Sequence, residues 1–290
     1  MSIAEQVRQA FGFSVDKLPL RGPEGLVTPF YGLFRSDTGE VASKMAVSRQ
    51  YTPHKPDDVV ALAEACEQAF DGQAVKATCL FKDGHHVVVQ PGKEYRRSIF
   101  GTADNIFPRV IIRAGYDGRA FRATLGAYRD ACRNLMMLRR VSGISVAIRH
   151  DSNIRENMDD LIRKFATVAS RWQDVESAAE EMQSRDVRLT EFLTALYGEP
   201  NDTSRTAVAR HKSRTEAIVR RVIRERYQTG RPDLGSDFVV SGWEAYNAVQ
   251  GYVQHESRRN GRPNEIERAI AALGNASVID AERLVFDLAL

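Results

Sequence analysis

Two Asp-Gly dipeptides, each set between β-rich runs, constrain the fold of this chain most strongly. The segments "VKATCLF-KDGH-HVVVQ" (75–90) and "RVIIRAGY-DG-RAFRATLG" (109–126) surround Asp-Gly with valine, isoleucine and aromatic residues. Asp-Gly in this setting is the strongest short-range signal for a β-hairpin. We therefore predict two antiparallel hairpins in the first half of the chain.

Helical patterns occupy most of the remaining sequence. Apolar residues at helical spacing predict helices over 59–70 and over 128–140, the stretch "YRDACRNLMMLRR". No glycine or proline occurs from Ile144 to Tyr197, which predicts long helices beyond His150. Further helices are expected over 205–228, 241–259, 263–273 and 278–289. The expected fold is α+β, with an antiparallel β-hairpin-rich sheet region packed with helices and a mostly helical C-terminal half.

Breaks in these patterns divide the chain into three parts. Residues 14–56 hold five prolines and few periodic stretches, and "YGEPND" at 197–202 interrupts the helical half. We expect a loop-rich segment over 1–56, an α+β core with a basic hairpin face and a long helix over 57–198, and a helical C-terminal region over 199–290.

Positive charge is concentrated in the middle of the chain. The net charge of the whole sequence is +3, but residues 73–140 contain 13 basic and 5 acidic side chains, a local charge of +8. Screening confines the effect of a surface charge to about 10 Å, so local concentration matters more than the total. A binding site for a polyanion is therefore expected in the central segment.

The second hairpin carries most of this argument. A two-residue turn at Asp117-Gly118 would place Arg113 opposite Arg122, with Arg109 on the same face. The opposite face would be the core-facing one, with Val110, Ile112, Ala114, Tyr116, Phe121, Ala123 and Leu125. Like charges facing each other across strands repel, whereas a phosphate chain would bind both guanidinium groups. The alternative is that these arginines extend into water or pair with Glu94, Asp104 or Asp130.

Neighbouring segments extend the basic surface. Lys93, Arg96 and Arg97 are interleaved with Tyr95 and Phe100, a mixture that suits single-stranded nucleic acid because cations follow the backbone and rings stack on bases. On the helix expected over 128–140, the shared basic side consists of Arg129, Arg133 and Arg140. For both segments the alternative is a solvated basic surface with aromatic residues in the core. A second basic stripe would continue the path or pair with acidic helices, and it consists of Arg210, Arg214, Arg221 and Arg224.

Signatures of common enzymes and cofactor sites are absent from the sequence. There is no GxxxxGK[ST], no GxGxxG after a strand, no GxSxG and no HExxH. His85 and His86 are strand neighbours that point in opposite directions, and His150 is expected at the end of a strand. We expect no catalytic residue, metal or cofactor. A nuclease with dispersed acidic ligands stays open as a third alternative.

Several short motifs resemble one family. "RDACRN" (129–134) and "IRH" (148–150) are similar to the R-x-[VA]-C-x-N and I-R-H motifs of the phage- and plasmid-borne family called domain of unknown function 932. "AVSRQY" (46–51) resembles its V-S-x-x-Y segment, and "WEAYNAVQGYVQH" (243–255) resembles its W-x-x-x-N-A-V-x-x-Y-x-x-H motif. Asp151 departs from the small hydroxyl residue expected after the histidine. The resemblance implies a bacteriophage or mobile-element protein of the bacterial cytoplasm, and it implies no activity.

These observations lead to one function hypothesis with alternatives. The order of hairpins and helix is also similar to single-strand annealing recombinases of the RecT, Redβ and Erf type. We expect a DNA-binding protein for single-stranded DNA that anneals strands in recombination, as a homo-oligomeric ring or filament, without ATP or metal. Duplex DNA and RNA stay open as ligands. The alternative is a non-enzymatic module that modulates a host defence or replication protein. No apolar run is long enough to span a membrane.

Overall fold

The computed structural model describes residues 1–72, 74–99, 103–138, 141–151, 153–199, 204–231, 234, 237–257 and 264–290. They form two compact units, each assembled from separate stretches of the chain. Unit 1 consists of Met1–Gly92, Arg109–Leu125 and Gly143–Arg171, and unit 2 of Lys93–Pro108, Gly126–Ser142 and Trp172–Leu290. Strands predominate in the first half and helices in the second, so the expected α+β class is confirmed. The three-part division of the sequence at residues 56 and 198 stays a prediction.

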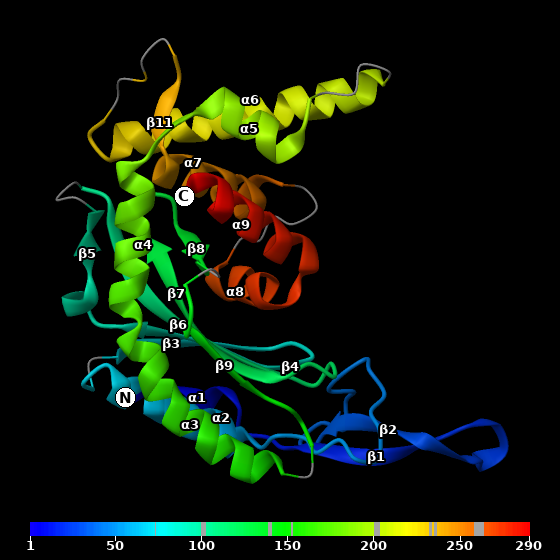
Figure 1. Cartoon of the computed structure of the whole chain (residues 1–290). Coiled ribbons are helices and arrows are strands. Elements are labelled where there is room, and N and C mark those ends of the chain that lie inside the picture. Colours follow the sequence, from blue (N-terminus) through cyan, green and yellow to red (C-terminus); the bar gives the residue numbers. More distant parts are fainter. Residues whose placement is uncertain are drawn as a thin grey trace. The chain divides into compact units, whose positions relative to one another are not determined.

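The strands form one large sheet and two small ribbons (Figure 1). The large sheet has the order β3-β4-β6-β7-β8, with β5 paired to β6 and β9 paired to β7. Its strands are β3 (Ala74–Phe81), β4 (Gly84–Pro91), β5 (Arg97–Ser98), β6 (Asn105–Gly115), β7 (Phe121–Arg129), β8 (Asn134–Met136) and β9 (Ser145–Ile148). The ribbons are β1 (Val15–Arg21) with β2 (Val27–Arg35), and β10 (Asp186–Arg188) with β11 (Val239–Ser241).

Both predicted hairpins are present. Strands β3 and β4 pair antiparallel, with Phe81 opposite His85 across the Asp83-Gly84 turn. Strands β6 and β7 are neighbours in the sheet, but five residues (116–120) separate them, so the expected two-residue turn is wrong. The reason is a tertiary contact, because the Tyr116 N–H donates to the carbonyl of Asp83, in the turn of the first hairpin, at 2.8 Å instead of continuing the β6–β7 ladder.

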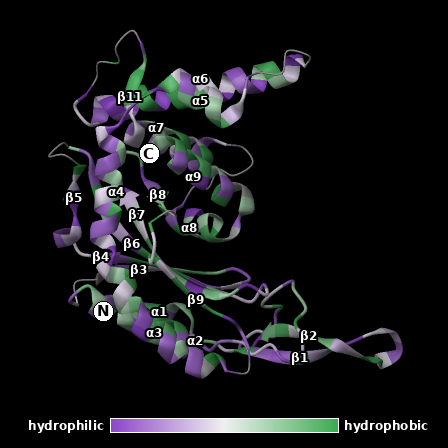
Figure 2. Ribbon diagram, in the orientation of Figure 1, coloured by the Kyte–Doolittle hydropathy of each residue, from purple (hydrophilic) through white to green (hydrophobic). Residues whose placement is uncertain are grey.

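Three helices pack side by side in unit 1: α1 (Ile3–Ala10), α2 (Pro56–Ala69) and α3 (Ile154–Ser170) (Figure 1). The first contacts β3, the second β4 and the third β9. The helices carry hydrophilic beside hydrophobic residues (Figure 2), as expected for helices with one buried face. The helix predicted over 59–70 is confirmed as α2, which ends before Asp71 and Gly72, both at positive φ.

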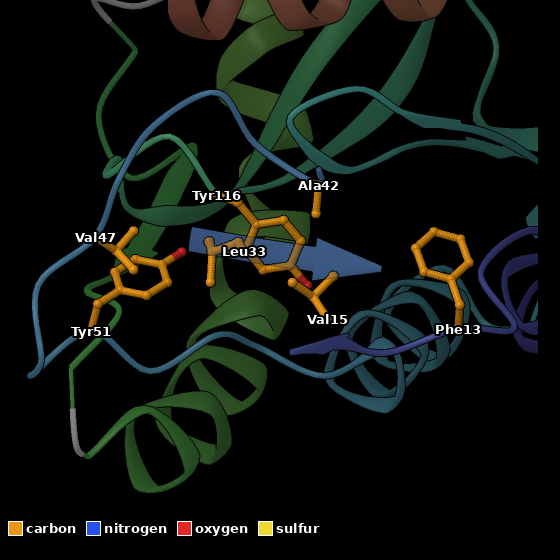
Figure 3. Close-up of a cluster of buried hydrophobic side chains, with 7 residues drawn as sticks. All are labelled: Phe13, Val15, Leu33, Ala42, Val47, Tyr51 and Tyr116. Atoms are coloured by element: carbon orange, nitrogen blue, oxygen red, sulfur yellow. The ribbon is translucent and has the colours of Figure 1, made fainter. Parts of the chain in front are cut away.

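A separate core lies where the β1–β2 ribbon joins the rest of unit 1 (Figure 3). It consists of Phe13, Val15, Leu33, Ala42, Val47, Tyr51 and Tyr116. Tyr116 follows β6, so this core connects the ribbon and the segment after it to the tip of the second hairpin. The segment that contains Tyr51 is thereby held against residues that are far away in sequence.

Unit 2 is built around α7 (Gly242–Gly251), whose ten residues are all buried. Ser241 and Glu244 form a capping box that fixes its first turn. The other helical elements of the unit are η2 (Lys93–Tyr95), α4 (Trp172–Ser184), α5 (Leu189–Tyr197), α6 (Arg205–Gln228), η4 (Tyr252–Glu256), α8 (Glu265–Gly274) and α9 (Ala276–Ala289). Of these, α4, α6 and α9 pack on α7. The predicted C-terminal helices are confirmed within a few residues.

The helix predicted over 128–140 is wrong. Strand β7 continues to Arg129, a turn follows, and β8 pairs back on β7 with Asn134 opposite Arg129. Arg133 in the turn and Leu138 after β8 have φ values of 55° and 45°, which an α-helix does not allow. Residues 134–138 are all buried, so this stretch has no solvent side at helical spacing.

No helix in the described part of the chain is long and apolar enough to cross a lipid bilayer.

Candidate functional site

The arginines predicted on the second hairpin lie mostly below the surface. Arg109 and Arg113 in β6 are 5% and 6% exposed, and Arg122 in β7 is half-buried. Arg113 forms an ion pair with Asp117, a residue of the same hairpin loop. Ile111 and Thr124 on this face are also buried, so the hairpin is packed on both faces and not only on the one expected to face the core. The residues of the opposite face, which were expected to face the core, are all buried: Val110, Ile112, Ala114, Tyr116, Phe121, Ala123 and Leu125.

The cations predicted to extend the basic surface, Lys93, Arg96 and Arg97, are solvent-exposed in unit 2. Lys93 belongs to η2, Arg96 follows it, and Arg97 begins β5. Arg97 forms an ion pair of 2.9 Å with Glu176, and the Arg96 guanidinium lies 5.6 Å from the centre of the Phe107 ring. Tyr95 is half-buried. Phe100 lies outside the described residues.

The arginines of the segment 128–140 do not form a stripe. Arg129 is 1% exposed and donates two hydrogen bonds, of 2.8 and 2.9 Å, to the Asp104 carboxylate. It also pairs with Glu225. Arg133 is exposed in the turn before β8, and Arg140 lies outside the described residues. Arg129 therefore has no surface to offer to a polyanion, because it is buried against Asp104 and Glu225.

Arg129 belongs to a buried polar network in unit 2. The Trp243 indole N–H donates to Asp104 at 2.9 Å, and Arg221 lies 3.1 Å from Glu225. A buried ion pair is tolerated when hydrogen bonds satisfy the remaining polar atoms, as they do for Asp104. This network connects α6, through Arg221 and Glu225, with α7, through Trp243.

Cys132 lies beside this network. Burial, together with the Glu225 carboxylate, raises the pKa of its thiol to about 12. A thiol with such a pKa is protonated at neutral pH and is a poor nucleophile. The cysteine is therefore suited to packing rather than to catalysis.

A cluster of buried histidines occupies unit 1. The His54 ring stacks on Tyr116 at 4.3 Å, and His54 Nε2 lies 2.8 Å from His85 Nδ1. The His150 ring stacks on Tyr51 at 5.1 Å with an interplanar angle of 16°. Burial lowers the pKa of His85 to about 3 and that of His150 to about 4, so both rings are neutral at pH 7. The sequence predicts His150 at a strand end but contains no signal for these contacts, because their partners are distant in the chain.

A pocket of about 430 Å³ opens beside His150. Its lining combines two cations with polar and buried aromatic groups, and consists of Ser48, Gln50, Tyr51, Gly118, Arg119, Ala120, Arg149, His150 and Asp151. All of these residues belong to unit 1. Among the residues that the structure describes, no three His, Cys, Asp or Glu side chains are grouped in a way that could hold a metal ion.

The most basic exposed element is helix α6 in unit 2. It contains eight basic and two acidic residues, a charge of +6. The stripe predicted on this helix is only partly present, because Arg221 is buried and Arg214 lies 4.4 Å from the centre of the Tyr197 ring. Arg210 and Arg224 are exposed, as predicted. Further exposed cations of the helix are Arg205, Lys212 and Arg220.

Comparison with known proteins gives one match. The model of the family described as "Domain of unknown function (DUF932)" matches residues 45–275, which is most of the chain. The chain belongs to the DUF932 family. No curated protein and no solved structure matches it.

The motifs that resemble the DUF932 pattern meet in two places. In unit 1, the V-S-x-x-Y and I-R-H segments meet where Tyr51 stacks on His150. In unit 2, the R-x-A-C-x-N and W-x-x-x-N segments meet where Asn134 Nδ2 donates to the Asn247 carbonyl at 2.8 Å. The second place is buried and structural. The first borders a pocket, so it is the one of the two that can admit a ligand.

Proposed function

We propose that this DUF932 protein binds single-stranded DNA through the exposed basic face of α6. The observation that supports this proposal is the excess of cations on one solvent-exposed helix. Of its two acidic residues, Glu225 is buried in the ion-pair network, so Glu216 is the acidic side chain that α6 presents to solvent. Lys212 and Arg220 share this carboxylate, at 3.9 and 3.7 Å. The remaining positive charge favours a polyanionic partner.

The first half of α6 supports this proposal because none of its residues is buried. From Arg205 to Ala217 every residue is exposed or half-buried, whereas Ile218, Arg221 and Val222 are buried. The helix is thus anchored by its second half and presents the first half to solvent. The Tyr197 ring beneath Arg214 adds an aromatic group beside the cations. Cations that follow a backbone, with a ring nearby, suit a flexible single strand.

The test is fluorescence anisotropy with a labelled single-stranded oligonucleotide. A variant with Arg210→Gln, Lys212→Gln and Arg220→Gln should weaken binding at least tenfold, since each cation accounts for about one phosphate contact. The matched control changes Arg163→Gln and Lys164→Gln, two exposed cations of α3 that share Asp160 as Lys212 and Arg220 share Glu216. Equal affinity of the α6 variant and the wild type would contradict the proposal.

The proposal includes strand annealing by an oligomer, without ATP or metal. Its support is the pair of consecutive hairpins, the part of the element order similar to single-strand annealing recombinases that is present, whereas β8 stands where the helix over 128–140 was expected to complete that order. Light scattering on the purified protein, with and without single-stranded DNA, tests this part. A large ring or filament that forms or grows with DNA is expected, and a monomer indifferent to DNA would contradict it.

A second candidate function is a protein-interaction module, and one observation favours it. An apolar pocket of about 450 Å³ lies between α5 and α6, with Leu189, Leu193, Val219 and Phe238 in its lining. Nearby, Ile223 and Tyr227 of α6 are 45% and 77% exposed. Apolar surface of this kind is typical of protein contacts. Phe238→Ser, a neutral change in the pocket lining outside α6, should weaken such a contact and leave the affinity for DNA unchanged.

A further inference from the structure

We propose that the pocket beside His150 in unit 1 binds a phosphate group, held by Arg119 and Arg149 and by a hydrogen bond from the His150 ring. The ligand class is a small phosphate monoester, carried either by a free mononucleotide or by the 5′ end of a nucleic acid strand. The site lies in a different unit from α6, so this proposal does not depend on the one above.

The first observation is a buried polar side chain that faces the pocket. His150 is 9% exposed and lines the cavity. The Thr52 backbone lies close to the ring, but neither ring nitrogen has a hydrogen-bond partner of normal geometry among the described residues. A buried polar atom without a partner costs about 1–3 kcal/mol. A ligand that accepts a hydrogen bond from this ring would remove the cost.

The second observation is the rigidity of the ring. His150 is stacked on Tyr51, and Tyr51 is fixed by the core around Val47 and Tyr116. The Tyr51 hydroxyl donates to the Gly115 carbonyl at 3.4 Å. Tyr51 is thus fixed by its hydroxyl, and it fixes one face of the His150 ring by stacking. The His150 ring therefore keeps one orientation and can donate to a ligand without a further loss of rotational freedom.

The third observation is the charge of the lining. Arg149 is exposed directly after β9, and the Arg119 side chain is 54% exposed in the hairpin loop, 3.8 Å from Asp117. Arginine binds phosphate through two parallel N–H groups, which gives both charge and geometry. The lining also contains one acidic residue, Asp151, whose Oδ1 is held by α3. It accepts hydrogen bonds from the Asn153 backbone at 3.0 Å and from Asn157 Nδ2 at 3.3 Å.

The size of the pocket limits the ligand. About 430 Å³ is within the range of small-molecule sites and suits one nucleotide rather than a polymer. Ser48 and Gln50 add hydrogen-bonding groups to the lining. The aromatic rings at the site stack on each other, so no ring is presented for stacking on a base. Recognition would therefore rest on the phosphate.

Isothermal titration calorimetry at low salt tests the site with dAMP and with deoxyadenosine, which lacks the phosphate. We expect dAMP to bind and deoxyadenosine not to bind. Arg149→Gln and Arg119→Gln should each weaken dAMP binding about tenfold or more, as should His150→Gln, while Arg163→Gln on α3 should change nothing. Equal binding of the two probes, no binding of either, or an unchanged dAMP affinity in both arginine variants would overturn the proposal.

A second arm distinguishes the two sources of phosphate. Anisotropy compares a short oligonucleotide with a 5′-phosphate and the same strand with a 5′-hydroxyl, both on the triple α6 variant. A 5′-phosphate preference that Arg149→Gln removes assigns the site to strand ends. Binding of dAMP without such a preference assigns it to a free nucleotide. Because the α6 surface is already disabled in this arm, loss of that surface and loss of the pocket give different results.

Discussion

Asn134 and Asn247 are 113 residues apart in the chain, yet Asn134 Nδ2 donates a 2.8 Å hydrogen bond to the Asn247 carbonyl in the interior of unit 2. Both side chains are fully buried. The contact joins β8 to the central helix α7, the two elements that carry the paired motifs of this unit. It is therefore a structural contact, and its loss should affect folding rather than ligand binding.

Replacement of Asn134 by alanine should destabilise the protein. The variant removes the donor and leaves a buried carbonyl without this partner, which costs about 1–3 kcal/mol. Urea unfolding followed by circular dichroism measures the change. Gln173→Ala, at an exposed position of α4, is the control and should change the stability by less than about 0.5 kcal/mol. Equal stability of Asn134→Ala and the control would show that the hydrogen bond contributes nothing.

Arg129 and Arg133 should behave in opposite ways although the sequence suggests one shared role. Arg129→Met removes the partner of two buried carboxylates, Asp104 and Glu225, and should cost about 3–5 kcal/mol or prevent folding. Arg133→Met changes an exposed turn residue and should leave the stability within about 0.5 kcal/mol. Thermal unfolding of the two variants makes the comparison. Similar losses in both would argue against the buried network.

Acidification should destabilise unit 1 through its histidines. Burial lowers the pKa of His150 from 6.5 to about 4, so the unfolded chain binds this proton at a higher pH than the folded one. The stability that neutral His150 contributes is thus complete above pH 6.5 and is lost as the pH falls from 6.5 toward 4. One such histidine accounts for about 2 kcal/mol at pH 5.

Urea unfolding at pH 7, 6 and 5 measures this dependence. His150→Gln should lose less stability than the wild type over the same range, because glutamine does not titrate. His211→Gln is the control, since His211 is a half-buried residue of α6 outside the cluster. A His150→Gln variant with the full pH dependence of the wild type would show that His150 is not buried in its neutral form.

The thiols should be unreactive in the folded protein. Burial raises the pKa of Cys79 to about 11 and, with Glu225, that of Cys132 to about 12, while Cys66 is fully buried. Thiolate is the reactive form, so labelling at pH 8 should be slow in buffer and rapid in urea. Rapid labelling of Cys132 in buffer would indicate that the buried network of unit 2 opens in solution.

The local spacing of apolar residues predicted much of the fold. It failed where every residue of a stretch is buried, because apolar and polar positions no longer alternate there. The helices and both hairpins depend on spacing and turn residues within one segment, so they are readable from the sequence. Residues 134–138 are all buried, so burial in this stretch does not alternate with the period of a helix. The match of its apolar residues to a helical period was therefore a coincidence. The arginine stripe inferred from that period was wrong for the same reason.

The candidate pocket could be predicted in part. Two of its three lining segments, those around Tyr51 and His150, are visible as short motifs, but nothing in either one indicates that they meet. The contact depends on tertiary packing around Tyr116, which brings together stretches about 100 residues apart. Likewise, the ion pair between Arg113 and Asp117 was not predicted, because a two-residue turn was expected where the structure has a longer hairpin loop.

The salt dependence of single-stranded DNA affinity tests the central claim most directly. The slope of log affinity against log salt counts phosphate contacts, at about 0.7 per contact for single strands. We expect the variant Arg210→Gln, Lys212→Gln, Arg220→Gln to lower the magnitude of this slope by about 2 relative to the wild type, with the variant Arg163→Gln, Lys164→Gln unchanged. A slope that is the same in the α6 variant and the wild type, or an affinity that does not fall with salt, would contradict DNA binding by α6.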